Sequence, residues 1–401
     1  MDLKHRLSTL RRQSGFTPDE PPMPGVMERL ERYRRGGRSG CAGRIGAEAL
    51  AATLGGAVLE DGVILIERRI GLDESHGRIP LARLLEDYDP LPDARGRDPR
   101  QFLFLDTETS GLAGGTGTVV FLLGLARIEG QALVVRQYHL TRFGAEGAML
   151  SAAGDWLREA GCIVSYNGKC FDIPLLAARH RLCAVHDPLE RLAHLDLLHA
   201  TRRAFNRRWG DCRLVTAERK LLAFERCDDV PGAEAPEAWF AWVRRNDPGR
   251  LPGIARHNHW DVLSLAALVP ALVDAHAQPG AWEADVAALA RGLMARGEEQ
   301  AARKLLAEHR EMLDGDGLLA LGRLHRRSGH WSAARAIWEP LAAEGCQQAM
   351  ECLAKYHEHV ARDPVRALDY ALRLPAGAEQ DVRRQRLRQK LGLQPAPALF
   401  R

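Results

Sequence analysis

Hydrophobic and polar positions alternate with different periods along the 401-residue chain, and the changes of period divide it into regions. Apolar runs near 102–106, 118–128 and 132–140 predict three consecutive antiparallel strands. Helices and shorter strands follow, and the last helical segment continues to about Asp274, with Pro270 as an expected kink. This order predicts an α/β domain over 101–278, in which a mixed sheet is flanked by helices.

The region before these strands has a weaker pattern. Ala47 to Leu54 is helix-like, and two apolar runs flank Asp61-Gly62, a pair typical of a hairpin turn. A linker rich in Pro, Gly and Asp covers 87–100. We therefore expect 45–100 to form a small α+β appendage and linker. The segment 1–44 is rich in Arg, Pro and Gly, and we expect an N-terminal helix and a flexible linker there.

From about residue 281 the chain changes to helices rich in Ala, Leu and Arg. Gly297 and Gly329 are separated by about one period of ~34 residues, and each precedes a helix of small residues. A third, looser copy begins at Asp363. We expect all-α, tetratricopeptide-like helical repeats over 281–395, which would offer a concave face to a protein partner. The alternative is a plain helical domain that packs on the preceding one.

The most specific chemical pattern lies at the end of the first apolar strand. Phe102 to Leu105 is apolar, and Asp106 and Glu108 follow with one residue between them. Side chains at i and i+2 of a strand point to the same face, so the two carboxylates would lie side by side. Their repulsion would be removed by Mg²⁺ or Mn²⁺, because hard cations prefer carboxylate oxygens. Taken alone, the pattern also fits a solvated turn.

Two later segments add residues of the same kind. Asn167-Gly168 follows a short β-rich run, and Asp172 precedes an expected helix. His257 and Asp261 are four residues apart at the start of the last helical segment, so they share one face of that helix.

The order of these blocks, Asp-x-Glu, then Asn-x4-Asp, then His-x3-Asp, resembles the DEDD family of 3′–5′ exonucleases, which have a ribonuclease H-like fold. More of the chain resembles the YprB-type branch of ribonuclease H-like proteins, over roughly 100–275. The supporting pieces are His194-Leu195-Asp196-Leu197-Leu198-His199, Arg202-Arg203, Cys212-Arg213-Leu214 and Asp228-Asp229-Val230-Pro231-Gly232. Asp196 is expected to be a buried structural partner rather than a ligand.

The resemblance implies a metal-dependent nuclease that hydrolyses phosphodiester bonds of single-stranded or 3′-overhang nucleic acid with two Mg²⁺ or Mn²⁺ ions. The expected metal ligands are four carboxylates, and the expected substrate contacts are three neighbouring residues. The ligands are Asp106, Glu108, Asp172 and Asp261; the substrate contacts are Thr107, Asn167 and Phe171. Asn167 has an alternative role as a turn residue.

His257 is the expected catalytic base, because an imidazole with an ordinary pKa near 6.5 can accept a proton from water. It departs from the family pattern. One subclass has Tyr four residues before the last Asp, and the other has His five residues before it, where this chain has Arg256. This departure supports a second hypothesis, a nucleic-acid-binding scaffold that has lost turnover. A third, an endonuclease of the same fold, stays open because the fold alone does not decide between them.

Charge and cysteine content refine this picture only slightly. The net charge of +4 does not by itself indicate nucleic-acid binding, but a basic stretch separates the second and third blocks. Its members are Arg202, Arg203, Arg207, Arg208, Arg213, Arg219 and Lys220, interleaved with Phe205 and Trp209. It could bind a phosphate backbone and stack a base, or be a solvated amphipathic helix.

The eight cysteines are scattered without a Cys-x2-Cys pair, which argues against a zinc site of that kind. Without a secretory signal either, reduced thiols in the cytoplasm are expected. No apolar run is long enough to predict a membrane span.

Overall fold

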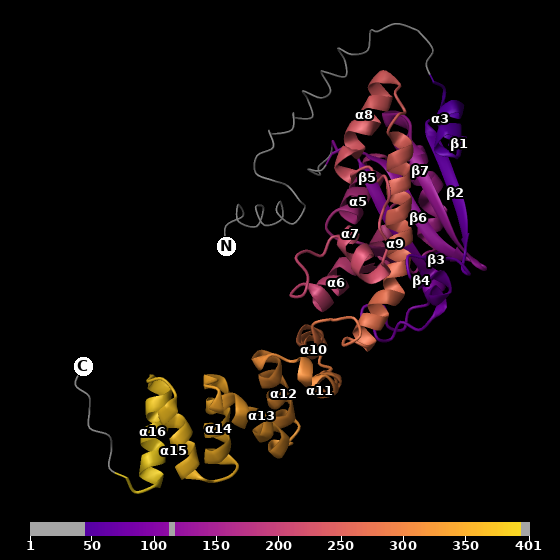
Figure 1. Ribbon diagram of the computed structural model, residues 1–401. Coiled ribbons are helices and arrows are strands. Elements are labelled where there is room, and N and C mark those ends of the chain that lie inside the picture. Colours follow the sequence, from indigo (N-terminus) through magenta and orange to yellow (C-terminus); the bar gives the residue numbers. More distant parts are fainter. Residues whose placement is uncertain (1–44, 112–116, 394–401) are drawn as a thin grey trace.

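The protein is described here by a computed structural model that covers residues 45–111 and 117–393 (Figure 1). The helix and linker expected over 1–44 lie outside the described residues. Seven strands form one sheet, flanked by helices, and a further all-helical region follows. The predicted fold class, a mixed sheet with flanking helices and an all-α C-terminal part, is confirmed.

The sheet has the spatial order β1-β2-β7-β6-β5-β8-β9. The strands are β1 (Ala57–Glu60), β2 (Val63–Gly71), β5 (Phe102–Thr109), β6 (Val120–Glu129), β7 (Ala132–Leu140), β8 (Cys162–Ser165) and β9 (Ala193–Asp196). Neighbours from β1 to β5 pair antiparallel, whereas β8 pairs parallel with both β5 and β9. The three consecutive antiparallel strands predicted from the sequence are therefore confirmed as β5, β6 and β7.

Both faces of the sheet are covered, which explains why β5 begins as an uninterrupted apolar run. Phe102 and Phe104 pack into one core, and Leu103 and Leu105 pack into the other, as the two-residue period of a strand requires. Asp106 and Glu108 follow Phe102 and Phe104 at the same two-residue spacing, so their side chains point to the same face of the sheet.

Helices on the two faces come from different parts of the chain. The core that contains Phe104 also takes residues from α6 (Leu197–Phe205) and α9 (Leu251–Ala277). The core that contains Leu105 takes residues from α3 (Ala47–Leu54), α4 (Glu146–Glu159), α5 (Asp172–Leu182) and α8 (Ala235–Arg245). Between α6 and α8, α7 (Leu214–Ala217) continues into a π-helical turn over Glu218–Leu222.

The helix α9 begins at Leu251, earlier than the sequence pattern predicted, and contains Pro270 in its interior. Among the described residues it is the helix long and apolar enough to cross a membrane by length and composition. However, 78% of its most apolar window is buried inside the protein. It therefore acts as the core helix against the sheet, where it contacts β5, β6 and β7.

The segment 45–100, expected as a separate appendage, is in part built into the same sheet. The hairpin at Asp61-Gly62 joins β1 to β2, and β2 pairs with β7 from Val63 to Gly71. The sequence identified the hairpin, but not its partner, because the pairing with β7 joins positions about 70 residues apart. A small ribbon follows, made of β3 (Ser75–His76) and β4 (Ile79–Pro80).

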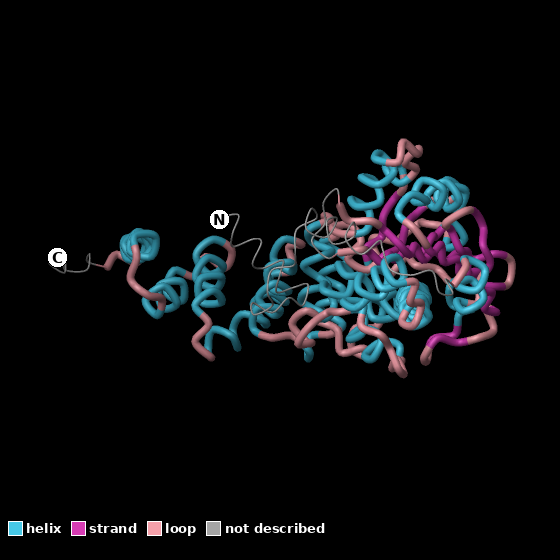
Figure 2. Tube along the Cα trace, turned by 90° about the horizontal axis from the view of Figure 1, so that it is seen from above, coloured by secondary structure: helices cyan, strands magenta, loops and turns pink. Residues whose placement is uncertain are grey.

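The C-terminal region continues the chain as successive packed helices that lead away from the sheet (Figures 1 and 2). They are α10 (Val286–Ala295), α11 (Glu299–Glu308), α12 (Gly315–Arg327), α13 (Trp331–Ala343), α14 (Gln347–His359), α15 (Pro364–Arg373) and α16 (Ala378–Lys390). We call this region the helical arm. Its assignment to tetratricopeptide-like repeats stays a prediction.

Candidate metal centre

Four carboxylates from three distant segments converge beside the C-terminal end of β5. Asp106 and Glu108 lie on that strand, Asp172 begins α5, and Asp261 lies on α9. Electrostatic repulsion from Asp261 and Asp172 acts on both Asp106 and Glu108, which shows that the group shares one site. The structure thus brings together the four predicted metal ligands.

The environment of these carboxylates disfavours their ionised form. Burial raises the pKa of Asp106 well above its usual range, and the charges of Asp261, Asp172 and Glu108 raise it further. Burial, followed by Asp261 and Asp172, does the same to the pKa of Glu108. Burial also raises the pKa of Asp172 to about 6. A site with this much unbalanced negative charge favours a bound cation.

Asp106 is held by a hydrogen bond from α9, at a place where three neighbouring strands line up. Asp106 pairs across the sheet with Gly124 of β6, which pairs with Gln137 of β7. On α9, the Asn258 side chain donates from Nδ2 to Asp106 Oδ2 at 2.8 Å and accepts from Gln137 Nε2 at 2.8 Å. A Cβ on Gly124 would clash with Asn258, so glycine at this position lets α9 approach the strand.

The second block forms a tight loop that places Asp172. Asn167 has a left-handed backbone with φ of 68°, and Asp196 accepts hydrogen bonds from the backbone N–H groups of Asn167 (2.7 Å) and Lys169 (3.1 Å). Asp196 is 3% exposed and also caps α6, so it is the buried structural partner that the sequence predicted. The conformation of Asn167 fits its alternative role as a turn residue.

The other two expected substrate contacts differ in their surroundings. The Thr107 hydroxyl donates to Asp172 Oδ1 at 2.5 Å, so Thr107 holds a carboxylate of the site. Phe171 is 45% exposed at the edge of the same loop, which leaves its ring free to contact a ligand.

His257 lies against the same group of carboxylates. Its Nε2 is 3.3 Å from Asp261 Oδ2 and 4.0 Å from Glu108 Oε1, and its Nδ1 is 2.8 Å from Asp229 Oδ1. Single ligand atoms of Glu108, His257 and Asp261 all lie within 4.8 Å of one another, close enough to hold one metal ion. The four-residue spacing of His257 and Asp261 accounts for this, because one helical turn separates them.

Arg226 is a functional residue that the sequence analysis missed. Its guanidinium donates to Asp261 Oδ1, to both carboxylate oxygens of Glu218, and to Asp229 Oδ2 at 3.3 Å. Burial lowers the pKa of Arg226, but Asp261 and Glu218 outweigh this effect and raise it above its ordinary value. Arg226 therefore stays charged and offsets part of the negative charge of the site.

Asp229 was also missed as a site residue, although it belongs to the Asp228–Gly232 piece of the family resemblance. Neither Arg226 nor Asp229 stands in a periodic element, because both lie in the loop between the π-helical turn and α8. The acidic pair before Val-Pro-Gly was the one signal that could have identified this loop.

The two aromatic residues of the basic stretch between the second and third blocks differ in exposure, and of the two only Trp209 keeps part of its surface accessible. Phe205 is fully buried and stacks on Trp209, with ring centroids 4.2 Å apart. Arg203 pairs with Asp93, and Arg207 lies 4.0 Å from Asp285. Phe205 is therefore a core residue, because the amphipathic helix α6 turns it inward.

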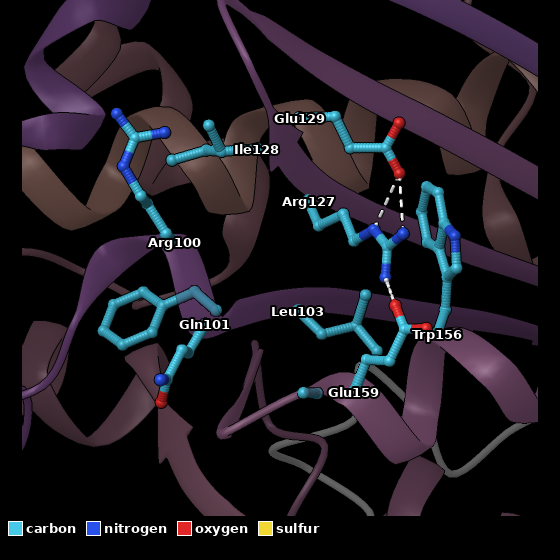
Figure 3. Close-up of a pocket in the computed structure, with 10 residues that line it drawn as sticks. Arg100, Gln101, Leu103, Arg127, Ile128, Glu129, Trp156 and Glu159 are labelled. Atoms are coloured by element: carbon cyan, nitrogen blue, oxygen red, sulfur yellow. Dashed lines mark hydrogen bonds and ion pairs between the residues drawn. The ribbon is translucent and has the colours of Figure 1, made fainter.

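A cavity of about 270 Å³ lies at the opposite, N-terminal end of β5 (Figure 3). Arg127 crosses it, paired with Glu129 and Glu159 and lying over the Trp156 ring. Arg127 is paired with carboxylates there and the cavity contains none of the four carboxylates of the site, so we assign it no role in the chemistry.

Comparison with known proteins supports this fold. Residues 103–273 match a sequence model of the RNase H superfamily, a range that includes all four carboxylates. The chain is 35% identical over 295 residues to the uncharacterized protein YprB of Bacillus subtilis (strain 168), covering 69% of this chain and 70% of that protein. The chain therefore belongs to the same family as YprB, and its residues 103–273 form a domain of the RNase H superfamily.

A search of solved structures gives a weak similarity to the family B DNA polymerase of the hyperthermophilic archaeon Pyrobaculum calidifontis. The TM-score is 0.33 and the identity 17%, over 57% of this chain. The chain spans 29% of that polymerase.

The residues present fit the divalent metals that RNase H-like folds use. The proposed donors are the oxygens of the four carboxylates, which suit Mg²⁺ and Mn²⁺. The raised pKa values of Asp106 and Glu108 show that this charge is not balanced by the protein itself.

Proposed function

We propose that the protein is a metal-dependent 3′–5′ exonuclease that hydrolyses phosphodiester bonds of single-stranded or 3′-overhang nucleic acid. The observation that carries this proposal is the convergence of Asp106, Glu108, Asp172 and Asp261 at the end of β5, with His257 beside them. The polarity of cleavage rests on the resemblance of the three sequence blocks to DEDD exonucleases.

The proposed cofactor is a pair of Mg²⁺ or Mn²⁺ ions. When bound, such ions lower the pKa of an attacking water and stabilise the charge on the leaving oxygen. Asp106, Glu108, Asp172 and Asp261 would hold them. Asn258 orients Asp106, Thr107 orients Asp172 and Arg226 orients Asp261, so three of the four carboxylates are fixed by hydrogen bonds from the protein.

The proposed role of His257 is to accept the proton of the attacking water at Nε2. That atom faces Glu108 and Asp261, the side on which the reacting water would lie. The O–H bond of the water breaks as its oxygen bonds to phosphorus. The P–O3′ bond then breaks, and the released 3′ oxygen takes a proton from solvent. Phe171 is the proposed contact for the terminal nucleotide, because its ring is exposed beside Asp172.

One observation supports a second candidate function, a nucleic-acid-binding protein without turnover. The ion pair between Arg226 and Asp261 occupies one oxygen of a proposed ligand. Against it, Asp261 keeps its second oxygen facing His257, and all four carboxylates are present. We therefore favour the nuclease.

Two further proposals concern the whole protein. We propose a cytoplasmic location, since the seven cysteines in the described part of the chain are free thiols. A protein partner for the helical arm also stays a proposal, supported by the successive helix pairs of α10 to α16.

The test compares the wild type with Asp106→Asn on single-stranded RNA and on 3′-overhang DNA, each labelled at either end, with Mn²⁺, Mg²⁺ or EDTA. The matched control is Asp155→Asn, which changes an exposed carboxylate (76%) in the same way. We expect a ladder from the 3′ terminus that requires metal, is lost in Asp106→Asn and persists in the control. Internal cuts appearing first would indicate an endonuclease. Binding without any cleavage would support the non-catalytic function.

A further inference from the structure

Asp229 and His257 form a hydrogen-bonded pair at the edge of the candidate metal centre. His257 Nδ1 lies 2.8 Å from Asp229 Oδ1 and 2.9 Å from Oδ2, so one ring nitrogen faces a carboxylate outside the group of four. The other nitrogen, Nε2, faces Asp261 and Glu108. The imidazole ring thus lies between Asp229 on one side and the carboxylates of the candidate metal centre on the other.

These contacts decide which ring nitrogen carries the proton. A carboxylate is only an acceptor, so a bare Nδ1 at 2.8 Å would place two lone pairs against each other. Arg226 Nη1 also lies near Nδ1, at 3.2 Å, and would favour the opposite assignment. The carboxylate contacts are shorter, and Arg226 Nη1 has Asp229 Oδ2 as an acceptor at 3.3 Å. The proton therefore belongs on Nδ1, which leaves Nε2 bare.

We propose that Asp229 is a positioning residue for the reaction: it holds His257 with its proton on Nδ1 and the Nε2 lone pair directed at the metal centre. This inference rests on the proposed nuclease function. When Nε2 takes the proton of the attacking water, the ring becomes a cation that still donates from Nδ1 to Asp229. The proton then passes to solvent, and the ring returns to its starting form.

The proposal also accounts for the unusual position of His257 relative to the family pattern. At four residues before Asp261 its ring lies on the same helix face as that carboxylate. The loop after Arg226 then supplies the partner that keeps the ring in place, and Gly232 of the same loop packs near Nε2. Arg226 ties the loop to Glu218 and Asp261.

The test uses Asp229→Asn and the matched control Asp228→Asn in the full chain. Asp228 is the exposed neighbour, and its left-handed φ of 52° is one that Asn tolerates. An amide at 229 can present N–H to Nδ1 and so reverse the tautomer. We expect kcat to fall about 10- to 100-fold in Asp229→Asn at unchanged KM and melting temperature, and to stay at the wild-type value in Asp228→Asn. Asp229→Glu should restore part of the rate.

A second readout does not depend on activity. Nitrogen-15 NMR of histidine-labelled, metal-free protein, with His257→Gln used to assign the signals, reports which nitrogen of His257 is protonated. We expect Nδ1–H in the wild type and a shift toward Nε2–H in Asp229→Asn. Protonated Nε2 in the wild type, or equal kcat for the two Asn variants, overturns the positioning role. An inactive wild type would count against the nuclease, while the NMR result would still decide the tautomer.

An independent observation concerns the helical arm, where a groove of about 390 Å³ lies among α12, α13, α14 and α16. Its lining contains four Lys or Arg side chains and one carboxylate, Glu351. Arg323 donates a hydrogen bond to the neutral Gln348 side chain, and neither Arg323 nor Arg326 forms an ion pair within the described part of the chain. The remaining two cations are Lys355 and Arg383, both of which have acidic neighbours.

Aromatic side chains stand beside these cations. Trp331 and Tyr356 line the same groove with their ring centroids 5.8 Å apart and their planes tilted by 34°. Guanidinium groups and aromatic rings in one groove are the combination that binds the phosphates and bases of single strands. The volume also lies within the usual range of ligand pockets, roughly 300–1,000 Å³.

We infer that this groove binds single-stranded nucleic acid, as an anchoring site apart from the metal centre. The inference extends the proposed function, because a nuclease acting from the 3′ end gains affinity from a second contact with the same polymer. Arg323 and Arg326 lack the carboxylate partners that Arg127 has in the cavity at β5.

Binding can be measured without cleavage in the Asp106→Asn background, by fluorescence anisotropy of a labelled 30-nucleotide single strand in EDTA. We compare Arg323→Ala/Arg326→Ala with Lys304→Ala/Arg366→Ala, which removes two exposed arm cations that have acidic partners (76% and 65% exposed). We expect the groove pair to weaken binding about 3- to 10-fold more than the control pair, with a shallower salt dependence. Trp331→Ala should also weaken binding.

Equal affinities of the two double variants for the single strand would overturn the inference that the groove binds nucleic acid. If poly-glutamate displaces the labelled strand at a lower concentration than unlabelled oligonucleotide does, the groove would be assigned to acidic proteins. That result would also overturn the inference. If the parent protein binds no single strand, the proposed nuclease itself loses support. If it binds and the groove variants bind equally well, only this inference fails.

Discussion

At the scale of single residues, the candidate metal centre is held under electrostatic strain by the fold. Asp106, Glu108 and Asp172 all have pKa values raised by burial and by neighbouring carboxylates, Asp261 among them. The Arg226 guanidinium donates to Asp261, Glu218 and Asp229. Carboxylates with raised pKa values lower the free energy of unfolding whenever they are ionised. A bound cation should reverse that effect, because it favours the ionised, folded form.

This strain predicts a pH dependence for the metal-free protein. The pKa of Asp172 is about 6 when folded, above its ordinary value of 3.8, so the folded state binds more protons between these values. Stability due to this group is therefore present below about pH 4 and is lost as the pH rises through 6. In EDTA, Asp172→Asn should gain stability over the wild type by about 2–3 kcal/mol between pH 4 and pH 7.

Urea unfolding at several pH values measures this difference, with Asp155→Asn as the control for an exposed carboxylate. Adding Mn²⁺ should invert the order, since the wild type then gains more from binding. A difference between Asp172→Asn and the wild type that is constant with pH would show that Asp172 is not under strain.

The sequence predicts those site residues that stand at fixed spacings within an element. Asp106 and Glu108 follow from the two-residue period of a strand, and His257 with Asp261 follows from one helical turn. The contacts of Arg226 and Asp229 do not follow from any period, because a loop carries both residues and their partners Asp261 and His257 lie about 30 residues further along. Their roles are set by tertiary contacts alone.

At the scale of elements, the site depends on how closely α9 packs on the sheet. Asn258 of α9 reaches Asp106 across Gly124 of β6, and Gln137 of β7 holds the far side of the same amide. A single side chain thus links three strands to the helix that carries Asp261 and His257. The spacing between the helix and β6 therefore controls the position of the carboxylates.

Gly124→Ala should disturb this spacing. The added Cβ would clash with the Asn258 side chain, so either α9 moves away or Asn258 releases Asp106. We expect a loss of about 1–3 kcal/mol in the free energy of unfolding, together with weaker metal binding in a calorimetric titration with Mn²⁺.

The control is Gly210→Ala, since a Cβ there meets no atom within 4 Å. Combining Gly124→Ala with Asn258→Ala should remove the clash, so the double variant loses less than the sum of the single ones. Additive losses would mean that Gly124 matters for the strand itself and not for its contact with α9.

The sequence also predicts most elements, but not how they assemble. The helix Ala47–Leu54 and the hairpin at Asp61-Gly62 were both expected, because turn residues and apolar runs are local signals. Their place at the edge of the main sheet was not expected, since β2 pairs with β7, a strand about 70 residues further along the chain. Local patterns do not encode which strand is the partner.

At the scale of the whole molecule, the sheet domain and the helical arm share one helix. Leu289 and Ala284 belong to the core that contains Phe104 and α9, whereas Val286 and Ala290 of the same segment belong to the core of the arm. The Asp285 N–H also donates to the Ala204 carbonyl of α6 at 2.7 Å. The boundary expected between 278 and 281 therefore falls before a helix that the sheet domain needs.

Fragments that end on either side of α10 test this arrangement. A fragment of residues 1–278 leaves the α9 core without Leu289, which is 3% exposed in the intact chain, whereas 1–296 retains it. Burial of one leucine stabilises by about 1.5–3 kcal/mol, so 1–278 should melt several degrees lower, at about 2–4 °C per kcal/mol. Leu289→Ala in 1–296 should lower the melting temperature in the same direction. Equal melting temperatures for the two fragments would mean that α10 belongs to the arm alone. The groove variants could then be studied on an arm that begins at 281.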